Sequence, residues 1–284
     1  MAIYLTDVHT HSTFSPDGRN SLEEMLATAQ AKGLTFYGVS EHIDYDLQLA
    51  GTISDAYAAK GFTKPDEYFH AARHLQEDYA GVLNVLVGAE FGYSEDARAV
   101  KMYQEFIDKY APDFVVNSIH TLHGIDYWNG TNYFEDGEGK TIPRDKDEVY
   151  KEYLALLLRS VRADYHYDIV GHMGYVTRYA PYEDRSMPYA RYAAEIDAVL
   201  NEIIARDKIL EVNSSGKDAS HGLPSKEILQ RYFELGGRKV SFASDAHDIG
   251  RVADKREMVV DLLKEVGFTY ITVPCKGEHI KVEI

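Results

Sequence analysis

Short apolar runs alternate with helix-like segments along the whole chain of 284 residues. Each run has the length and composition of a buried strand, and the segments between them are long enough to form a crossover helix. The strand-like runs lie at 3–5, 34–39, 83–87, 114–116, 169–170, 209–213 and 240–243, with a further short one at 270–273. Such alternation is typical of a parallel sheet, because each helix returns the chain to the same end of the sheet. The sequence therefore predicts an α/β fold.

Helix boundary signals support this pattern. Ser21 and Glu24 have the spacing of a capping box, and Gly33 is placed to end the helix that begins there. Pro112 follows another helix-like segment, where proline commonly marks an end. We expect helices at about 21–33, from 65 onward, 96–110, 147–165, 188–205, 225–235 and 253–266. A long polar segment at 121–146 is expected to be a loop, and loops of this length are usually either functional lids or disordered.

Length and composition favour a single soluble domain. With 45% hydrophobic and 27% charged residues, the chain can bury a sizeable core, and 284 residues suit one α/β barrel. No repeat or linker divides it, so we expect one domain over residues 1–284. Cys275 is the only cysteine, which excludes an internal disulfide and suits a reducing compartment. Without a signal-peptide pattern or a membrane-spanning apolar window, the expected location is the cytoplasm, with no membrane partner.

The net charge of −16 bears on possible partners. Nucleic-acid binding normally depends on a basic face, so this charge argues against a nucleic-acid partner. It does not exclude a small anionic substrate, because bound divalent ions would offset the acidic groups locally.

Metal-competent side chains follow almost every predicted strand. These residues are His9 and His11, His42, Glu90, His120, His172, Asp245 and His247. Residues two apart in a strand face the same way, so His9 and His11 project together. Any one of these histidines could be an ordinary buried histidine, but the carboxyl ends of barrel strands converge, which predicts a metal cluster there. His70 and His74 also have metal-ligand spacing, but they lie on a predicted helix away from strand ends and are expected at the surface.

The order of these motifs resembles the polymerase and histidinol phosphatase (PHP) family. The matching stretches are Asp7-Val8-His9-Thr10-His11, Asp17-Gly18, Glu41-His42, Gly88-Ala89-Glu90, Ser118-Ile119-His120, Gly171-His172 and Ser244-Asp245-Ala246-His247. The resemblance runs from residue 7 to about 250, and residues 9–18 look most like the histidinol-phosphatase branch. It implies a TIM-barrel-like, distorted (β/α)7 barrel that holds three divalent metal ions, zinc, manganese or iron, at the carboxyl ends of its strands.

The family pattern also implies how the ligands are shared. One ion would take His9, His11, Glu90 and Asp245, and a second would share Glu90 and add His120 and His172. The third would take Asp17, His42 and His247. Some relatives carry histidine in place of Asp17, and an oxygen ligand there would favour a harder ion. Ser15-Pro16-Asp17-Gly18 is also a good turn sequence, so a turn role for Asp17 remains open.

The resemblance implies a metal-dependent phosphate monoester hydrolase. The expected reaction converts L-histidinol phosphate to L-histidinol and phosphate, a step of histidine biosynthesis, by attack of a metal-bridging hydroxide. Glu90, Asp245 and His247 would then be catalytic as well as metal-binding.

Four further residues are expected to bind the substrate. Arg178 and Arg251 follow the motif histidines closely and could clamp phosphate oxygens, since guanidinium binds them in bidentate geometry. Glu211 and Asn213 end the sixth predicted strand on one face and could receive the imidazole or the ammonium group. Nearby aromatic residues could stack on the imidazole or serve only in packing: Phe91, Tyr93, Tyr127 and Trp128.

Three alternatives remain open at this point. The family includes phosphoesterases that act on nucleotides or other small esters, and amidohydrolase barrels also begin with His-x-His. A non-catalytic metal-binding barrel is a third possibility, although the complete ligand set argues against it. The oligomeric state is not predicted.

Overall fold

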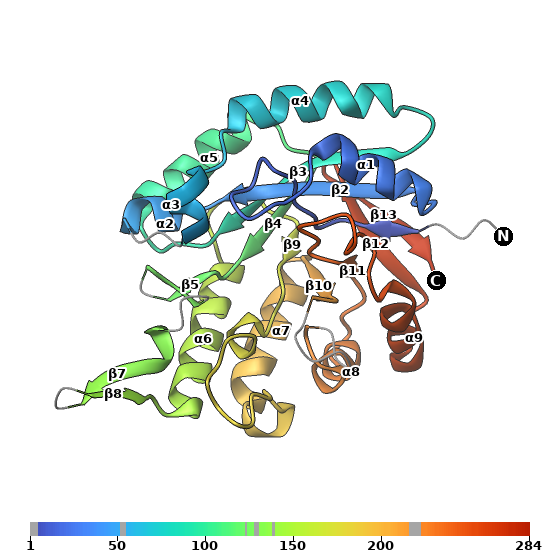
Figure 1. Ribbon diagram of the computed structural model, residues 1–284. Coiled ribbons are helices and arrows are strands. Elements are labelled where there is room, and N and C mark those ends of the chain that lie inside the picture. Colours follow the sequence, from blue (N-terminus) through green and yellow to red (C-terminus); the bar gives the residue numbers. More distant parts are fainter. Residues whose placement is uncertain (1–4, 52–54, 123, 128–130, 138–139, 216–222) are drawn as a thin grey trace.

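Seven parallel strands form one sheet in the order β1-β2-β3-β4-β9-β10-β11. The computed structural model, which describes residues 5–51, 55–122, 124–127, 131–137, 140–215 and 223–284, is shown in Figure 1. The strands are β1 (Thr6–Asp7), β2 (Phe36–Ile43), β3 (Asn84–Gly92), β4 (Val115–Ser118), β9 (Ile169–Val170), β10 (Ile209–Asn213) and β11 (Val240–Ala243).

The two outer strands of this order come together and nearly close a barrel. The Val8 amide donates to the Phe242 carbonyl (3.3 Å), and just beyond β1 and β11 the His11 amide donates to Ala246 (2.8 Å). In return, the Asp245 amide donates to the His9 carbonyl (3.0 Å). The expected distorted (β/α)7 barrel is therefore confirmed, with a seam where the first strand meets the last.

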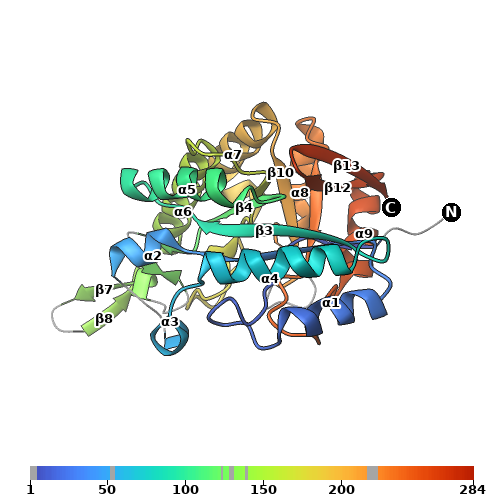
Figure 2. The same ribbon diagram turned by 90° about the horizontal axis from the view of Figure 1, so that it is seen from above.

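Helices follow the strands and surround the barrel, as Figures 1 and 2 show. They are α1 (Leu22–Ala31), α4 (Pro65–Asp78), α5 (Ala97–Tyr110), α6 (Lys146–Val161), α7 (Ala193–Ala205), α8 (Lys226–Glu234) and α9 (Arg256–Val266). The predicted capping box is present at α1, where the Ser21 side chain accepts from the Glu24 amide and the Glu24 carboxylate accepts from the Ser21 amide. All seven predicted helices are confirmed, with ends shifted by a few residues. Nowhere in the described ranges is a helix long and apolar enough to cross a bilayer.

Several short elements were not predicted from the sequence. The loop after β2 contains α2 (Tyr45–Ala50) and α3 (Asp55–Lys60). The predicted C-terminal strand β12 (Tyr270–Cys275) forms a hairpin with β13 (Glu278–Glu283), which was not predicted. The polar segment after β4 forms β5 (Thr121–Leu122), β6 (Ile125–Asp126), a 3₁₀ turn (Thr131–Tyr133), β7 (Phe134–Gly137) and β8 (Lys140–Pro143). Two further 3₁₀ turns lie at Tyr175–Thr177 and Tyr189–Arg191. The described part of the polar segment after β4 thus forms short strands and a turn, where a loop was expected.

One buried aromatic ring packs directly against the backbone of β2 and β3. Phe114, which is buried, lies against Gly38 on β2 and Gly88 on β3. A Cβ at Gly38 would lie 2.8 Å from this ring, and one at Gly88 would overlap it. Glycine is therefore required at both positions because the ring occupies the space of a side chain.

Candidate metal centre

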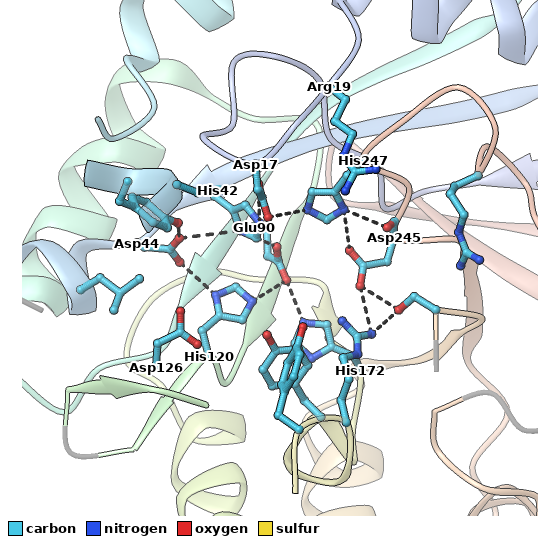
Figure 3. Close-up of a pocket in the computed structure, with 18 of the residues that line it drawn as sticks. Asp17, Arg19, His42, Asp44, Glu90, His120, Asp126, His172, Asp245 and His247 are labelled. Carbon is cyan, nitrogen blue, oxygen red and sulfur yellow. Dashed lines mark hydrogen bonds and ion pairs between the residues drawn. The ribbon is translucent and has the colours of Figure 1, made fainter. Parts of the chain in front are cut away.

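Glu90, near the end of β3, lies at the centre of a group of histidines (Figure 3). Its Oε1 lies 3.0 Å from His120 Nε2 and 3.0 Å from His172 Nε2, and it accepts a hydrogen bond from Ser118 (2.6 Å). Its Oε2 lies 2.9 Å from His42 Nδ1. The Glu90 carboxylate is almost completely buried. Histidines from the ends of three other strands, β2, β4 and β9, surround it.

The histidines after β1 approach the same carboxylate from the seam. His9 Nε2 and His11 Nε2 lie 3.3 and 3.5 Å from Glu90 Oε2. Asp245, just after β11, places Oδ1 at 3.5 Å from His11 Nε2 and 4.0 Å from His9 Nε2. These four residues are the set that the family pattern implies for the first ion.

A third group lies beside the first two. Asp17 is 3.1 Å from His247 Nε2 and 3.7 Å from His42 Nε2. The His11 ring stacks against the rings of His42 and His247, and the distances between ring centres are 4.2 and 4.3 Å. The structure thus brings together all nine predicted ligands, including Asp17, although ligation itself stays a prediction.

The donor atoms of this cluster fit divalent metal ions. Six buried atoms of the cluster make no hydrogen bond of good geometry, although several lie close to an oppositely charged atom: His9 Nε2, His11 Nε2, His42 Nδ1, Glu90 Oε2, His172 Nδ1 and His247 Nε2. A buried polar atom left unsatisfied costs about 1–3 kcal/mol, so this concentration of such atoms requires a compensating group. Imidazole nitrogens with carboxylate oxygens are donors that zinc, manganese and iron accept. The donor chemistry of the cluster therefore fits a metal-binding site.

The electrostatics keep two of these groups, Glu90 and His11, in the forms that bind metal. Burial raises the pKa of the Glu90 carboxyl, but the charges of His9 and His120 outweigh burial and hold this pKa well below its usual range. Burial, together with His42 and His247, lowers the pKa of His11 to about 3. Glu90 is therefore ionised and His11 neutral at physiological pH, as metal coordination requires.

Glu211 and Asn213 lie beneath the cluster instead of in a substrate-binding wall. Both are fully buried on β10, and neither lines the cavity. Glu211 Oε1 is 2.6 Å from His9 Nδ1, and Oε2 accepts from the His172 amide (2.6 Å) and from Asn213 Nδ2 (3.0 Å). With these contacts made, Glu211 does not reach a substrate, so the expected substrate-binding role of this pair does not agree with their placement.

A cavity of about 510 Å³ opens onto the metal centre, and both predicted phosphate-binding arginines line it. The Arg178 guanidinium lies 3.3 Å from Asp245 Oδ2 and packs over the Tyr175 ring at 4.8 Å. Arg251 also forms an ion pair with Asp254 at 2.6 Å. The Arg178 cation thus lies next to the Asp245 side of the cluster.

The opposite wall carries carboxylates that sequence reasoning missed. Asp44 and Asp126 line the cavity on the His120 side in Figure 3. Asp44 Oδ1 lies 3.0 Å from His120 Nδ1, and the Tyr57 hydroxyl donates to the same carboxylate. Asp44 lies two residues after His42, directly after β2. The same two-residue spacing identified His9 and His11 as a pair, so it could also have identified Asp44 as a residue of the site. Asp126 carried no comparable signal, because its position depends on the short hairpin of β5 and β6.

The expected stacking residues do not lie in this cavity. Phe91, Tyr93 and Tyr127 are buried in the hydrophobic core, and Trp128 lies outside the described residues. The aromatic residues that line the cavity are Tyr57, Tyr175 and Tyr179. His70 and His74 are exposed on α4, as expected.

Comparisons with known proteins agree with the geometry. Residues 7–215 match the family model of the PHP domain. A probable histidinol-phosphatase of Clostridium acetobutylicum is 32% identical over 245 residues, which cover 85% of this chain and 86% of that protein. The histidinol-phosphatase of Lactococcus lactis subsp. lactis is 27% identical over 264 residues, with 92% and 91% covered. A crystal structure of the histidinol phosphate phosphatase from Lactococcus lactis subsp. lactis, complexed with zinc, L-histidinol and phosphate, matches with a TM-score of 0.81 at 25% identity, covering 99% of this chain and 100% of that one.

The family match includes the strand ends that carry seven of the nine clustered residues, from His9 to His172. Asp245 and His247 lie beyond the matched residues but join the same cluster across the barrel seam. The chain belongs to the PHP domain family.

Proposed function

We propose that this protein is a metal-dependent phosphatase that hydrolyses L-histidinol phosphate to L-histidinol and phosphate. The observation that carries the proposal is the division of charge around one cavity. Arg178 lies at the Asp245 side of the metal centre, Arg251 lines the same cavity, and Asp44 and Asp126 lie at the His120 side. A substrate with a phosphate at one end and a cationic amine and imidazole at the other would match both walls. The relatives described above carry the corresponding name.

Three divalent ions would be held by the three groups described above. His9, His11, Glu90 and Asp245 would hold the first, and Glu90 would join His120 and His172 for the second. Asp17, His42 and His247 would hold the third, where the oxygen of Asp17 favours a harder ion such as manganese or iron over zinc. Bound ions of this kind lower the pKa of a coordinated water and neutralise charge on a phosphoryl group.

The chain's own residues would fix the ester across the cluster. Arg178 and Arg251 would bind phosphoryl oxygens that carry negative charge in the ground state and the transition state. Asp126 and Asp44 would accept hydrogen bonds from the cationic end of the leaving group. Holding both ends limits the substrate to one orientation, which contributes to rate by placing the phosphorus against the metal centre.

The first test is phosphate release by the metal-loaded protein. L-Histidinol phosphate, p-nitrophenyl phosphate and a nucleoside monophosphate would be compared, with metal content measured on the same sample. We expect a strong preference for L-histidinol phosphate and loss of activity after chelation. Equal or faster turnover of the other esters would contradict the substrate assignment and favour a phosphoesterase for nucleotides or other small esters.

A further inference from the structure

β10 contributes none of the predicted metal ligands, yet its carboxyl end lies directly beneath the metal centre. The strand pairs with β9 on one side and with β11 on the other. Both neighbours end in ligands, His172 after β9 and Asp245 after β11. Two polar side chains of β10, Glu211 and Asn213, are fully buried at this point, where a polar group needs a defined partner.

Glu211 contacts ligands from two separate strands. One oxygen lies 2.6 Å from His9 Nδ1, and the other accepts the backbone amide of His172 at 2.6 Å. His172 has a φ of 22°, a conformation that costs a non-glycine residue of the order of 1–3 kcal/mol and persists only when neighbours hold it. The same carboxylate therefore orients one ligand side chain and stabilises the backbone that presents another.

Asn213 extends this contact to a third ligand. Its Nδ2 donates to Glu211 Oε2 at 3.0 Å and lies 3.4 Å from Asp245 Oδ2. The Ser215 hydroxyl donates to the same Asp245 oxygen at 2.9 Å, and the Ser215 amide donates to Asn213 Oδ1 at 2.9 Å. A continuous hydrogen-bonded chain thus runs from His9 through Glu211 and Asn213 to Asp245.

We propose that Glu211 is a positioning residue that couples the first and second ion sites. In the metal-bound protein its carboxylate would hold the proton of neutral His9 on Nδ1, which leaves the Nε2 lone pair for the ion that Glu90 and Asp245 would also bind. Through the His172 amide it fixes the ligand that completes the second site. This inference rests on the metal binding within the proposed function, but not on the identity of the substrate.

The test is the metal retention of Glu211→Gln. A carboxamide has a single acceptor oxygen, so it cannot serve both His9 and the His172 amide at once. Loss of such an outer partner lowers metal affinity about 10- to 100-fold. We expect Glu211→Gln to lose ions at correspondingly lower chelator concentration, as measured by metal per chain after dialysis, with an unchanged KM once the metal is restored.

Asp168→Asn is the matched control. Asp168 precedes β9 at the opposite end of the barrel, is also buried, and accepts the Val115 amide at 2.9 Å. This variant should lower the melting temperature but retain metal like the unsubstituted protein. If Glu211→Gln does not fold, Glu211→Asp keeps the charge on a side chain one methylene shorter, and the same loss of metal is expected.

Two outcomes would overturn the proposal. One is a Glu211→Gln or Glu211→Asp protein that retains metal at every chelator concentration as the unsubstituted protein does. The other is normal metal retention with a raised KM, which would make Glu211 a substrate-binding residue after all. Failure of the proposed function would look different, since the protein would release no phosphate from L-histidinol phosphate while its metal retention still depended on Glu211.

Discussion

Asp126 and Arg178 line the same cavity but would recognise different parts of a substrate. Arg178 lies beside Asp245, where the phosphoryl group is expected, whereas Asp126 lies on the His120 side with Asp44. At the scale of single residues, the proposed specificity therefore depends on a positive charge on one side of Glu90 and a negative charge on the other.

Substituting these two residues should separate phosphate recognition from recognition of the leaving group. Asp126→Asn should lower kcat/KM for L-histidinol phosphate about 10- to 100-fold, because a hydrogen bond to a charged group contributes about 1.5–3 kcal/mol. It should leave p-nitrophenyl phosphate, which has no cation, nearly unaffected. Arg178→Ala should lower kcat/KM for both esters by a similar factor. Parallel kinetics on the two esters provide the measurement, and an equal loss on both esters for Asp126→Asn would contradict this division.

At the scale of strands and helices, the sequence located the elements whose pattern is local. Alternation of apolar runs, the Ser21 capping box and the residues that follow each strand all depend on near neighbours, and the structure confirms them. The short helices α2 and α3 and the strand β13 were missed, because short elements are formed through tertiary contacts more than through their own propensity.

The sequence was sufficient to predict which residues gather at the site, but not the contacts that support them. Period two correctly placed Glu211 and Asn213 on one face of β10. The two-residue period does not show that this face contacts His9. That contact depends on how strands from both ends of the chain pack together in the barrel. Asp126 was missed for a related reason, since a two-residue strand in a polar segment has no periodicity to detect.

The packing of Phe114 against β2 and β3 gives a prediction at this scale. Gly88→Ala places a Cβ within the buried ring, and overpacking of this kind costs about 1–3 kcal/mol in the free energy of unfolding. Denaturant unfolding should show this loss, and the double variant with Phe114→Leu should recover part of it. Gly250→Ala, at an exposed position where the added Cβ would meet only the Asp248 carboxylate at 3.0 Å, should cost less stability than Gly88→Ala. An undiminished stability of Gly88→Ala would mean that the ring does not limit the approach of these strands.

For the whole molecule, the free energy of unfolding should depend on whether the cluster histidines bind metal ions or protons. Without metal, neighbouring carboxylates overcome burial and raise the pKa of four cluster histidines, His9, His42, His120 and His247. Burial lowers the pKa of two others, His11 and His172. A raised histidine pKa contributes stability below the unfolded value of about 6.5, and this stability is lost as the pH rises. A lowered pKa acts in the opposite direction, but only up to about pH 6.5, where the unfolded histidine has lost its proton, so above this pH the change in stability comes from the four.

The stabilisation by metal should therefore increase with pH. Between pH 6 and 8 we expect the metal-free protein to lose stability, while the ions, which bind deprotonated histidines, bind more tightly. The difference in melting temperature between metal-loaded and chelated protein should widen over this range. Thermal unfolding at pH 6, 7 and 8 with and without chelator measures it. A difference that narrows toward pH 8 would show that the cluster does not couple metal binding to these protonation states.

The barrel seam also determines when the centre can form during synthesis. His9 and His11 leave the ribosome more than two hundred residues ahead of Asp245 and His247, and the strands that carry them meet only across the seam. Chains emerge from the N-terminus, so the first and third of the proposed ion sites cannot be complete until the last βα unit has been made. A partly made chain has histidines but no complete pocket for these ions. Stable uptake of the full set of ions should therefore be one of the last steps in maturation, and it marks the chains that have closed their barrel.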